Sequence, residues 1–139
     1  MVNANAGATG ATTRTLPGTL RFNSFGGGRF TTASRQIPTV NANSLPQNVQ
    51  NSFNQYNQAG WNGSLPTHTL GTRAGGTFRN NNGALPRFDA SGRPITYREF
   101  DVNNSIPGVN RDAQRFVVGS DGSIFFTNDH YGTFFRVMP

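Results

Sequence analysis

The second half of the chain alternates short apolar runs with turn residues, and this pattern most narrows what the chain can fold into. The runs are rich in aromatic and β-branched residues, which favour strands. They lie near 76–79, 95–102, 114–118, 123–127 and 133–137. Gly, Asn, Asp and Ser separate them, and Asp121-Gly122 between two apolar runs is typical of a β-hairpin. The pattern predicts an antiparallel sheet.

One helix is predicted ahead of these strands. Apolar residues recur at helical spacing at Val49, Phe53 and Tyr56, which predicts a helix over about 46–58 that ends before Gly60. A helix followed by a run of strands indicates an α+β fold, with the helix packed on one face of a twisted antiparallel β-sheet.

Trp61 and His68, which follow the helix, could each be structural or contact a ligand. Trp61 follows the helix stop, and together with Phe53 it is expected in the core rather than on a base-stacking platform. His68 stands alone between two threonines, which is typical of an exposed or hydrogen-bonded histidine rather than a ligand.

The first part of the chain lacks such periodicity. Residues 1–43 are rich in Gly, Asn, Thr and Ser, and only Leu20 and Phe22 hint at a short strand. We therefore predict a low-complexity tail or linker over 1–43, part of which could pack on the core. The folded domain is predicted over 44–139.

Charge and composition narrow the classes of function. All 12 basic residues are arginine, and the net charge is +6. No acidic residue precedes Asp89, so seven arginines in residues 1–88 are unopposed. Guanidinium groups suit phosphate because they bind its oxygens bidentately; the alternative is a solvated cationic surface.

Other classes of site are disfavoured. The absence of cysteine excludes a thiolate nucleophile or a thiolate metal site. A single glutamate and two distant histidines do not suit a metal-dependent nuclease, so neither metal nor cofactor is expected. No window approaches the ~18 to 20 apolar residues of a membrane span, and the N-terminus lacks a basic-then-apolar signal segment.

Four side chains in the strand region form a plausible catalytic set. Glu99, the only glutamate, lies on a predicted strand and shares a face with Tyr97. His130 lies at a turn, and Arg111 and Arg115 are four residues apart around another turn. A carboxylate and an imidazole can move two protons around a phosphodiester while guanidiniums hold its charge. Taken singly, Glu99 and the two arginines are more typical of a solvated surface.

Five motifs carry a resemblance to a known family. They are Phe78 to Pro86 (Phe-Arg-Asn-Asn-Asn-Gly-Ala-Leu-Pro), Ser91-Gly-Arg, Tyr97 to Asn103, Arg111 to Arg115, and Asn128 to Phe134. In order and approximate spacing the chain resembles the microbial guanyl-preferring ribonucleases, the barnase-like family, over about 46–138. The resemblance implies a helix-plus-antiparallel-sheet fold and metal-independent cleavage of single-stranded RNA by transesterification to a 2′,3′-cyclic phosphate.

The resemblance also implies roles for individual residues. Glu99 matches the family's general base and His130 its general acid. Arg111 and Arg115 match the phosphate-binding arginines, and Tyr131 matches a tyrosine that lines the phosphate site. These roles agree with those argued from side-chain chemistry alone.

The loop that matches the family's base-recognition loop departs from the pattern. It comprises Phe78, Arg79, Asn80, Asn81 and Asn82, where the family reads Phe-x-Asn-Arg-Glu. The family's glutamate accepts both donors of guanine's Watson–Crick edge, whereas the amide of Asn82 offers one acceptor and one donor. We therefore predict relaxed or altered base choice, with Asn80 and loop backbone groups still reading part of guanine.

A second departure concerns a lysine. The family's active-site helix lysine falls near Phe53, and this chain has no lysine. Arg79 or an arginine of the N-terminal part could take the place of this lysine.

The expected partners follow from this activity. A free ribonuclease endangers its producer, so we expect secretion or delivery as a toxin domain, or an acidic proteinaceous inhibitor that covers the cationic cleft. A monomer is expected. Two alternatives stay open: a catalytically weakened RNA-binding module on the same fold, and an interaction module in which the charged residues form a surface ion network.

Overall fold

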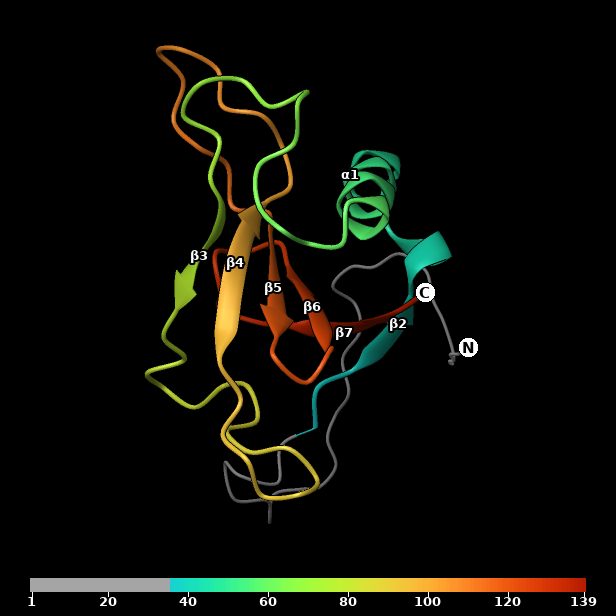
Figure 1. Ribbon diagram of the computed structural model, residues 1–139. Coiled ribbons are helices and arrows are strands. Elements are labelled where there is room, and N and C mark those ends of the chain that lie inside the picture. Colours follow the sequence, from blue (N-terminus) through green and yellow to red (C-terminus); the bar gives the residue numbers. More distant parts are fainter. Residues whose placement is uncertain (1–35) are drawn as a thin grey trace. The chain divides into compact units, whose positions relative to one another are not determined.

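The computed structural model describes residues 36–139 (Figure 1). The predictions for residues 1–35, including the strand at Leu20 and Phe22, lie outside this range. The described residues fall into two compact units. One comprises Pro46–Phe134, and the other comprises 36–45 together with Phe135–Pro139.

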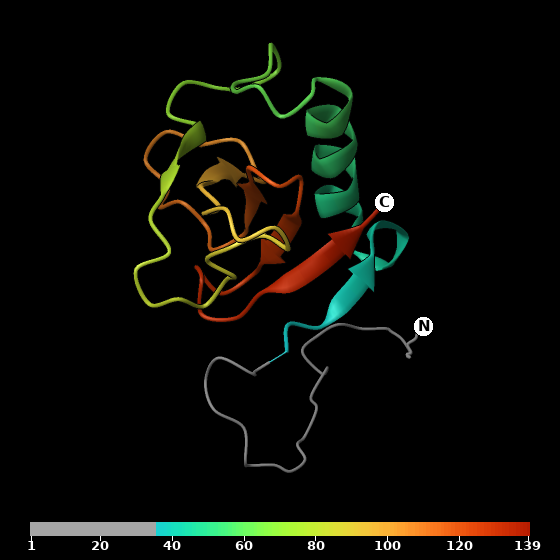
Figure 2. The same ribbon diagram turned by 60° about the horizontal axis from the view of Figure 1, so that its bottom comes forward.

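The larger unit contains one helix and four strands (Figures 1 and 2). They are α1 (Gln47–Gln58), β3 (Ala74–Phe78), β4 (Tyr97–Asp101), β5 (Arg115–Gly119) and β6 (Ile124–Thr127). The strands pair antiparallel in the order β3-β4-β5-β6. The α+β class, the helix and these four strands confirm the sequence prediction within one to two residues at most ends.

The smaller unit contains a parallel pair of strands. β2 (Thr39–Asn41) pairs with β7 (Phe135–Met138), and Val40 lies opposite Val137. A 3-10 turn, Ala42–Ser44, follows β2. β7 corresponds to the strand expected near 133–137, but the expectation of antiparallel pairing throughout was wrong here. The partner strand comes from the segment assigned to the tail, where three residues are too few for an alternation to be recognised.

Helix α1 covers one face of the four strands because its apolar stripe contacts their aromatic residues. Phe53 and Tyr56 are buried, and their rings meet Phe116 and Phe100 edge-on at centroid distances of 6.0 and 5.1 Å. Trp61 stacks on Tyr56 at 5.1 Å, which confirms its place in the core. Burial of such rings from water is the main stabilising contribution of this contact.

Strand alternation leaves a second face on β4 that α1 does not cover. Phe100 faces the helix, so Tyr97, Glu99 and Asp101 point to the opposite side. We call this the site face. Tyr97 closes one end of it by packing on Phe125 at a ring-centroid distance of 6.2 Å.

Local turn predictions are also confirmed. Gly60 ends the helix with φ of +77°, and Gly122 turns the hairpin between β5 and β6 with φ of +88°. His68 is hydrogen-bonded as expected: its Nε2 lies 3.2 Å from the Tyr56 hydroxyl, and its Nδ1 accepts from the Leu65 amide. Burial lowers the pKa of His68, so it is neutral near pH 7.

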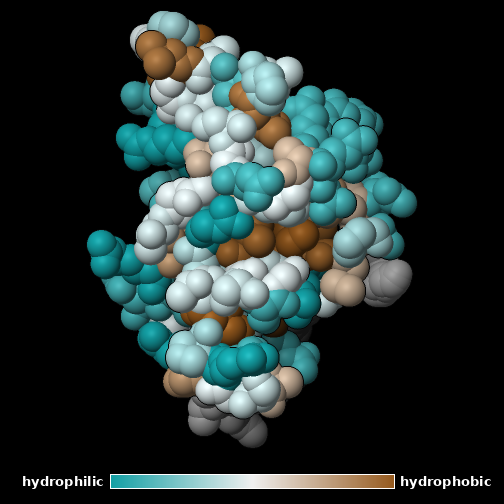
Figure 3. Space-filling model, in the orientation of Figure 1, coloured by the Kyte–Doolittle hydropathy of each residue, from teal (hydrophilic) through white to brown (hydrophobic). Residues whose placement is uncertain are grey.

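Two loops run side by side beyond the end of β4 (Figure 1). The Thr69 hydroxyl donates to the Ser105 carbonyl at 2.5 Å, and Asn104 donates to the Thr67 carbonyl at 3.0 Å. Their tips expose apolar side chains, seen as brown atoms at the top of Figure 3. Leu70 is 98% exposed and Ile106 is 60% exposed.

Within residues 36–139 no helix has the length and apolar character required to cross a bilayer.

Candidate active site

A buried carboxylate, Asp101, organises the end of β4 on the site face. It is only 4% exposed. Its Oδ1 accepts a hydrogen bond of 2.5 Å from Arg111 Nη2 and lies 3.1 Å from Arg115 Nε. Its Oδ2 accepts from the Arg73 amide at 2.9 Å, and its backbone carbonyl accepts from the Tyr56 hydroxyl at 2.6 Å. One residue thus joins the helix, two strands and the loop before β5.

The two arginines bound to Asp101 differ in accessibility. Arg115 is 3% exposed; its Nη1 donates to the Gln114 carbonyl and lies 3.6 Å from an Asp112 oxygen. Its Nε makes no hydrogen bond within the described chain, so the 3.1 Å contact with Asp101 is an ion pair without hydrogen-bond alignment. The side chain of Arg111 is 30% exposed and can reach a ligand. The hydrogen bond to Asp101, opposed by desolvation, raises the pKa of Arg111 and keeps it charged.

Glu99 lies two residues before Asp101, in the middle of β4. It pairs with Gly76 on β3 and Val117 on β5, so its backbone is fixed from both sides. Its carboxylate accepts a short hydrogen bond from the Tyr131 hydroxyl. Burial, and then the bond to Glu99, raise the pKa of Tyr131, while Arg115 and Arg111 act in the opposite direction. The phenol therefore stays protonated and orients the carboxylate.

His130 and Tyr131 occupy a turn that L-residues seldom adopt. Their φ angles are +57° and +75°, in the left-handed region. The His130 amide donates to the Ala113 carbonyl at 3.0 Å, which ties this turn to the loop before β5. The imidazole is exposed, and its ring centroid lies 4.8 Å from that of Tyr131. His130 is thus held beside the residue that binds Glu99.

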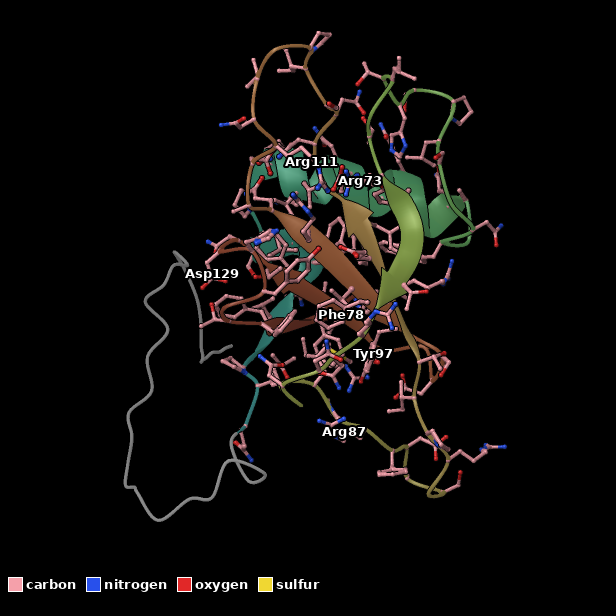
Figure 4. All side chains as sticks on the ribbon, turned by 90° about the vertical axis from the view of Figure 1, so that its left-hand side faces the viewer. Arg73, Phe78, Arg87, Tyr97, Arg111 and Asp129 are labelled. Atoms are coloured by element: carbon pink, nitrogen blue, oxygen red, sulfur yellow. The ribbon has the colours of Figure 1, made fainter. Side chains whose placement is uncertain are left out.

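Asp129, labelled at the left of Figure 4, holds the same turn by hydrogen bonds. Its oxygens accept from the Thr127 hydroxyl at 2.8 Å and from the Thr133 amide and hydroxyl at 2.8 and 2.7 Å. Desolvation alone would raise the pKa of Asp129, but the bonds from Thr133 and Thr127 outweigh it and lower the pKa. These contacts cap the turn and do not involve the His130 ring.

Phe78 and Asn80 begin the loop predicted to read a base. The Phe78 ring centroid lies 5.0 Å from that of Tyr131, so β3 brings this loop to the candidate catalytic residues. Asn80 is buried at φ of +53°, and its side chain makes two bonds to the Leu85 backbone, 3.0 Å from the amide and 2.9 Å to the carbonyl. The Asn80 side chain therefore holds the loop in shape. Only the backbone groups of Asn80 remain to bind a ligand.

The remaining loop residues are exposed. Asn82 accepts from the Ala84 amide at 3.1 Å, and the Asn81 carbonyl accepts from Arg87 at 3.4 Å. Arg79 also lies on the surface. The loop is closed underneath by the Tyr97 hydroxyl, which donates to the Pro86 carbonyl at 2.7 Å.

The structure thus places Glu99, Arg111, Arg115 and Tyr131 around one region and sets His130 against Tyr131. Sequence reasoning assigned no role to Asp101 or Tyr97. Their alternation with Glu99 along one strand was the signal that could have found them. Within the described chain no group of three or more His, Cys, Asp or Glu residues could hold a metal ion.

Comparison with protein families and known proteins gives consistent results. A family model described as ribonuclease matches residues 29–138, a longer stretch than the motifs alone indicated. The ribonuclease of Heyndrickxia coagulans is 42% identical over 87 residues, which cover 60% of this chain and 74% of that protein. The guanyl-specific ribonuclease St of Saccharopolyspora erythraea is 43% identical over 60 residues, covering 43% of this chain and 54% of its own length.

A solved structure is similar in fold. The crystal structure of ribonuclease Sa2 with guanosine-2′-cyclophosphate superposes with a TM-score of 0.55 and 26% sequence identity. The match covers 75% of this chain and 98% of ribonuclease Sa2. The similarity therefore extends over nearly the whole of that smaller protein.

The Asp101 contacts predict a large loss of stability in Asp101→Asn. The substitution leaves Arg115 buried next to a neutral group, and breaking a buried ion pair on one side costs about 3 to 5 kcal/mol. Asp112→Asn, which changes the exposed carboxylate 3.6 Å from Arg115, should cost at most about 1 kcal/mol. Urea unfolding measures both, and equal losses would contradict the central place of Asp101.

Proposed function

Since this chain belongs to the ribonuclease family and is an endoribonuclease of the microbial, barnase-like group, we propose that it cleaves single-stranded RNA without a metal by transesterification. The observation that carries the proposal is the convergence on Tyr131. Its hydroxyl binds Glu99, its ring lies against His130, and the charges of Arg111 and Arg115 act on it.

In the proposed first step Glu99 removes the proton of a ribose 2′-hydroxyl. The 2′-oxygen then attacks phosphorus, and the bond from phosphorus to the 5′-oxygen of the next nucleotide breaks. His130 gives its proton to that departing oxygen, so a 2′,3′-cyclic phosphate and a 5′-hydroxyl result. Arg111, accessible and charged, and Arg115 behind it stabilise the added negative charge on the phosphate.

In the proposed second step the same two groups act in exchanged roles. His130 removes a proton from water, the water oxygen attacks phosphorus, the bond from phosphorus to the 2′-oxygen breaks, and Glu99 returns a proton to that oxygen. The short bond from Tyr131 supports this exchange because it holds the Glu99 carboxylate in place in either protonation state.

An assay with RNA in EDTA tests the proposal. The wild-type chain should generate cyclic-phosphate ends, and Glu99→Ala or His130→Ala should slow cleavage by about 10²- to 10⁴-fold, the usual contribution of a general base or acid. His68→Ala is the matched histidine control, because His68 bonds to Tyr56 and Leu65 rather than to the site; with its fold checked by circular dichroism, it should retain cleavage.

The same assay judges the second candidate function, an RNA-binding module that has lost catalysis. The altered base loop, with Asn81 and Asn82 exposed, is the observation that favours it. RNA binding without cyclic-phosphate products would support the binding module. If the wild-type chain neither binds nor cleaves RNA, the interaction module with a surface ion network is the alternative that remains.

Base choice is a separate part of the proposal. The Asn80 side chain is bonded to the Leu85 backbone, so the loop backbone and the exposed side chains, Asn82 among them, are left to read the base. The amide of Asn82 opposes one of guanine's two donors. Of the base-reading groups predicted from sequence, we therefore retain the backbone and not the Asn80 side chain.

We expect relaxed guanine selection, and Asn82→Glu should increase it. A satisfied second donor is worth ~1 to 3 kcal/mol, so the preference for guanine should rise by about 5- to 150-fold. Cleavage rates of dinucleotides bearing each of the four 5′ bases measure this. Strict guanine selection in the wild type, unchanged in Asn82→Glu, would refute the idea.

An acidic inhibitor and delivery outside the producing cell complete the proposal. The net charge of +6 would attract an acidic protein to the site, and an active ribonuclease needs such a partner or export. We expect expression of the wild-type chain in a bacterial cytoplasm to arrest growth, and Glu99→Ala to be tolerated. Equal growth of both strains would remove the reason for an inhibitor.

A further inference from the structure

The described active site lacks a spare positive charge. Arg111 and Arg115 contribute two, and Asp101 and Glu99 remove two, so these four groups sum to zero. A phosphodiester brings one negative charge and gains more in the transition state. A further cation, besides His130, is therefore needed to favour phosphate over the solvent.

Three arginines of the described chain are engaged away from the site. Arg98 lies over the Phe100 ring, with Cζ 5.2 Å from its centroid, on the helix side of β4. Arg93 pairs with Asp89 at 3.5 Å, and Arg87 donates to the Asn81 carbonyl. Arg73 is exposed, and its guanidinium has no ion-pair partner in residues 36–139.

A β-bulge turns Arg73 to the site face. β3 and β4 pair regularly from Phe78 to Gly76, which lies opposite Glu99, but Ala74 then lies opposite Phe100. Gly75 is the extra residue, at φ of +94°. Without it, the register would place Arg73 opposite Val102, on the side of Phe100; with it, Arg73 falls opposite Asp101.

Hydrogen bonds confirm this pairing of Arg73 with Asp101. The Asp101 amide donates to the Arg73 carbonyl at 2.8 Å. The Arg73 amide donates to Asp101 Oδ2, while the Asp101 carbonyl accepts from Tyr56. Directly opposed residues of antiparallel strands have Cβ atoms only ~4.5 to 5.5 Å apart on one face. Figure 4 shows Arg73 and Arg111 next to each other at this end of the molecule, with Arg87 at the other.

We propose that Arg73 is a third phosphate-binding arginine, which contacts the same phosphate as Arg111. Asp101 fixes both: it holds Arg73 by its backbone and Arg111 by its guanidinium. The Arg73 guanidinium is left free to bind a ligand, whereas Arg115 is buried behind the carboxylate. This inference rests on the proposed function for its substrate, but the phosphate contact itself does not require catalysis.

Binding of guanosine 3′-monophosphate, compared with guanosine, isolates the phosphate contact. Arg73→Ala should weaken binding of the nucleotide by about 10-fold, the effect of one charge-assisted bond, and should leave binding of guanosine unchanged. Arg73→Lys should restore part of the loss. Arg93→Ala is the matched control, since it removes the same charge from the turn beyond the opposite end of β4 and should bind the nucleotide as the wild type does.

Kinetics on a dinucleoside monophosphate give the second readout. Arg73→Ala should lower kcat/KM by about 10- to 100-fold, and Arg93→Ala by less than about 2-fold. Thermal unfolding checks that the Arg73 variant folds, as expected for an exposed side chain whose fixed contacts are made by its backbone.

The outcomes separate the two proposals. Wild-type cleavage together with nucleotide affinity and kcat/KM unaltered in Arg73→Ala would overturn the role of Arg73 and leave the ribonuclease function standing. A wild-type chain that binds the nucleotide through Arg73 but does not cleave RNA would overturn the function and leave the phosphate contact standing. Equal losses of nucleotide affinity and kcat/KM in Arg73→Ala and Arg93→Ala would show that the effect comes from net charge alone. This result would also overturn the role of Arg73.

Discussion

The site depends on the ion pairs and hydrogen bonds of the buried Asp101 carboxylate. A charge removed from water is costly unless ion pairs and hydrogen bonds compensate it. Here Arg111 and Arg115 supply the charges, and the Arg73 amide supplies a further bond. The backbone of the same residue accepts from Tyr56, which belongs to the helix. Packing of the helix on the sheet and positioning of the arginines that we propose bind phosphate are therefore coupled through one residue.

Two departures from regular backbone geometry aim the side chains around this carboxylate. The bulge at Gly75 brings Arg73 opposite Asp101, and glycine suits it because φ is +94°. The turn at His130 and Tyr131 carries two consecutive left-handed L-residues, and Asp129 stabilises it through two threonines. Left-handed L-residues persist where surrounding contacts over-determine them. Both departures lie beside Glu99, because Gly76 pairs with Glu99 and the Tyr131 hydroxyl donates to it.

The outline of the fold was accessible from the sequence because its signals are local. The spacing of Val49, Phe53 and Tyr56 located the helix, and Asp121-Gly122 located the hairpin. The parallel β2–β7 pair was not found, since β2 has three residues and its partner lies almost a hundred positions away in the chain. Pairing over such a distance leaves no local signature.

By itself the sequence determined which chemistry was available: one glutamate, an arginine pair, a histidine turn and a basic charge, in an order matched by a ribonuclease family. Only the tertiary structure decided how these groups are used. Asn80 proved to be bound to Leu85, Asp101 to hold Arg111 and Arg115, and the Arg73 backbone to pair with Asp101. The physical reason is that residue type fixes the reactivity of a side chain, whereas strand register and burial fix its neighbours and hence its charge balance.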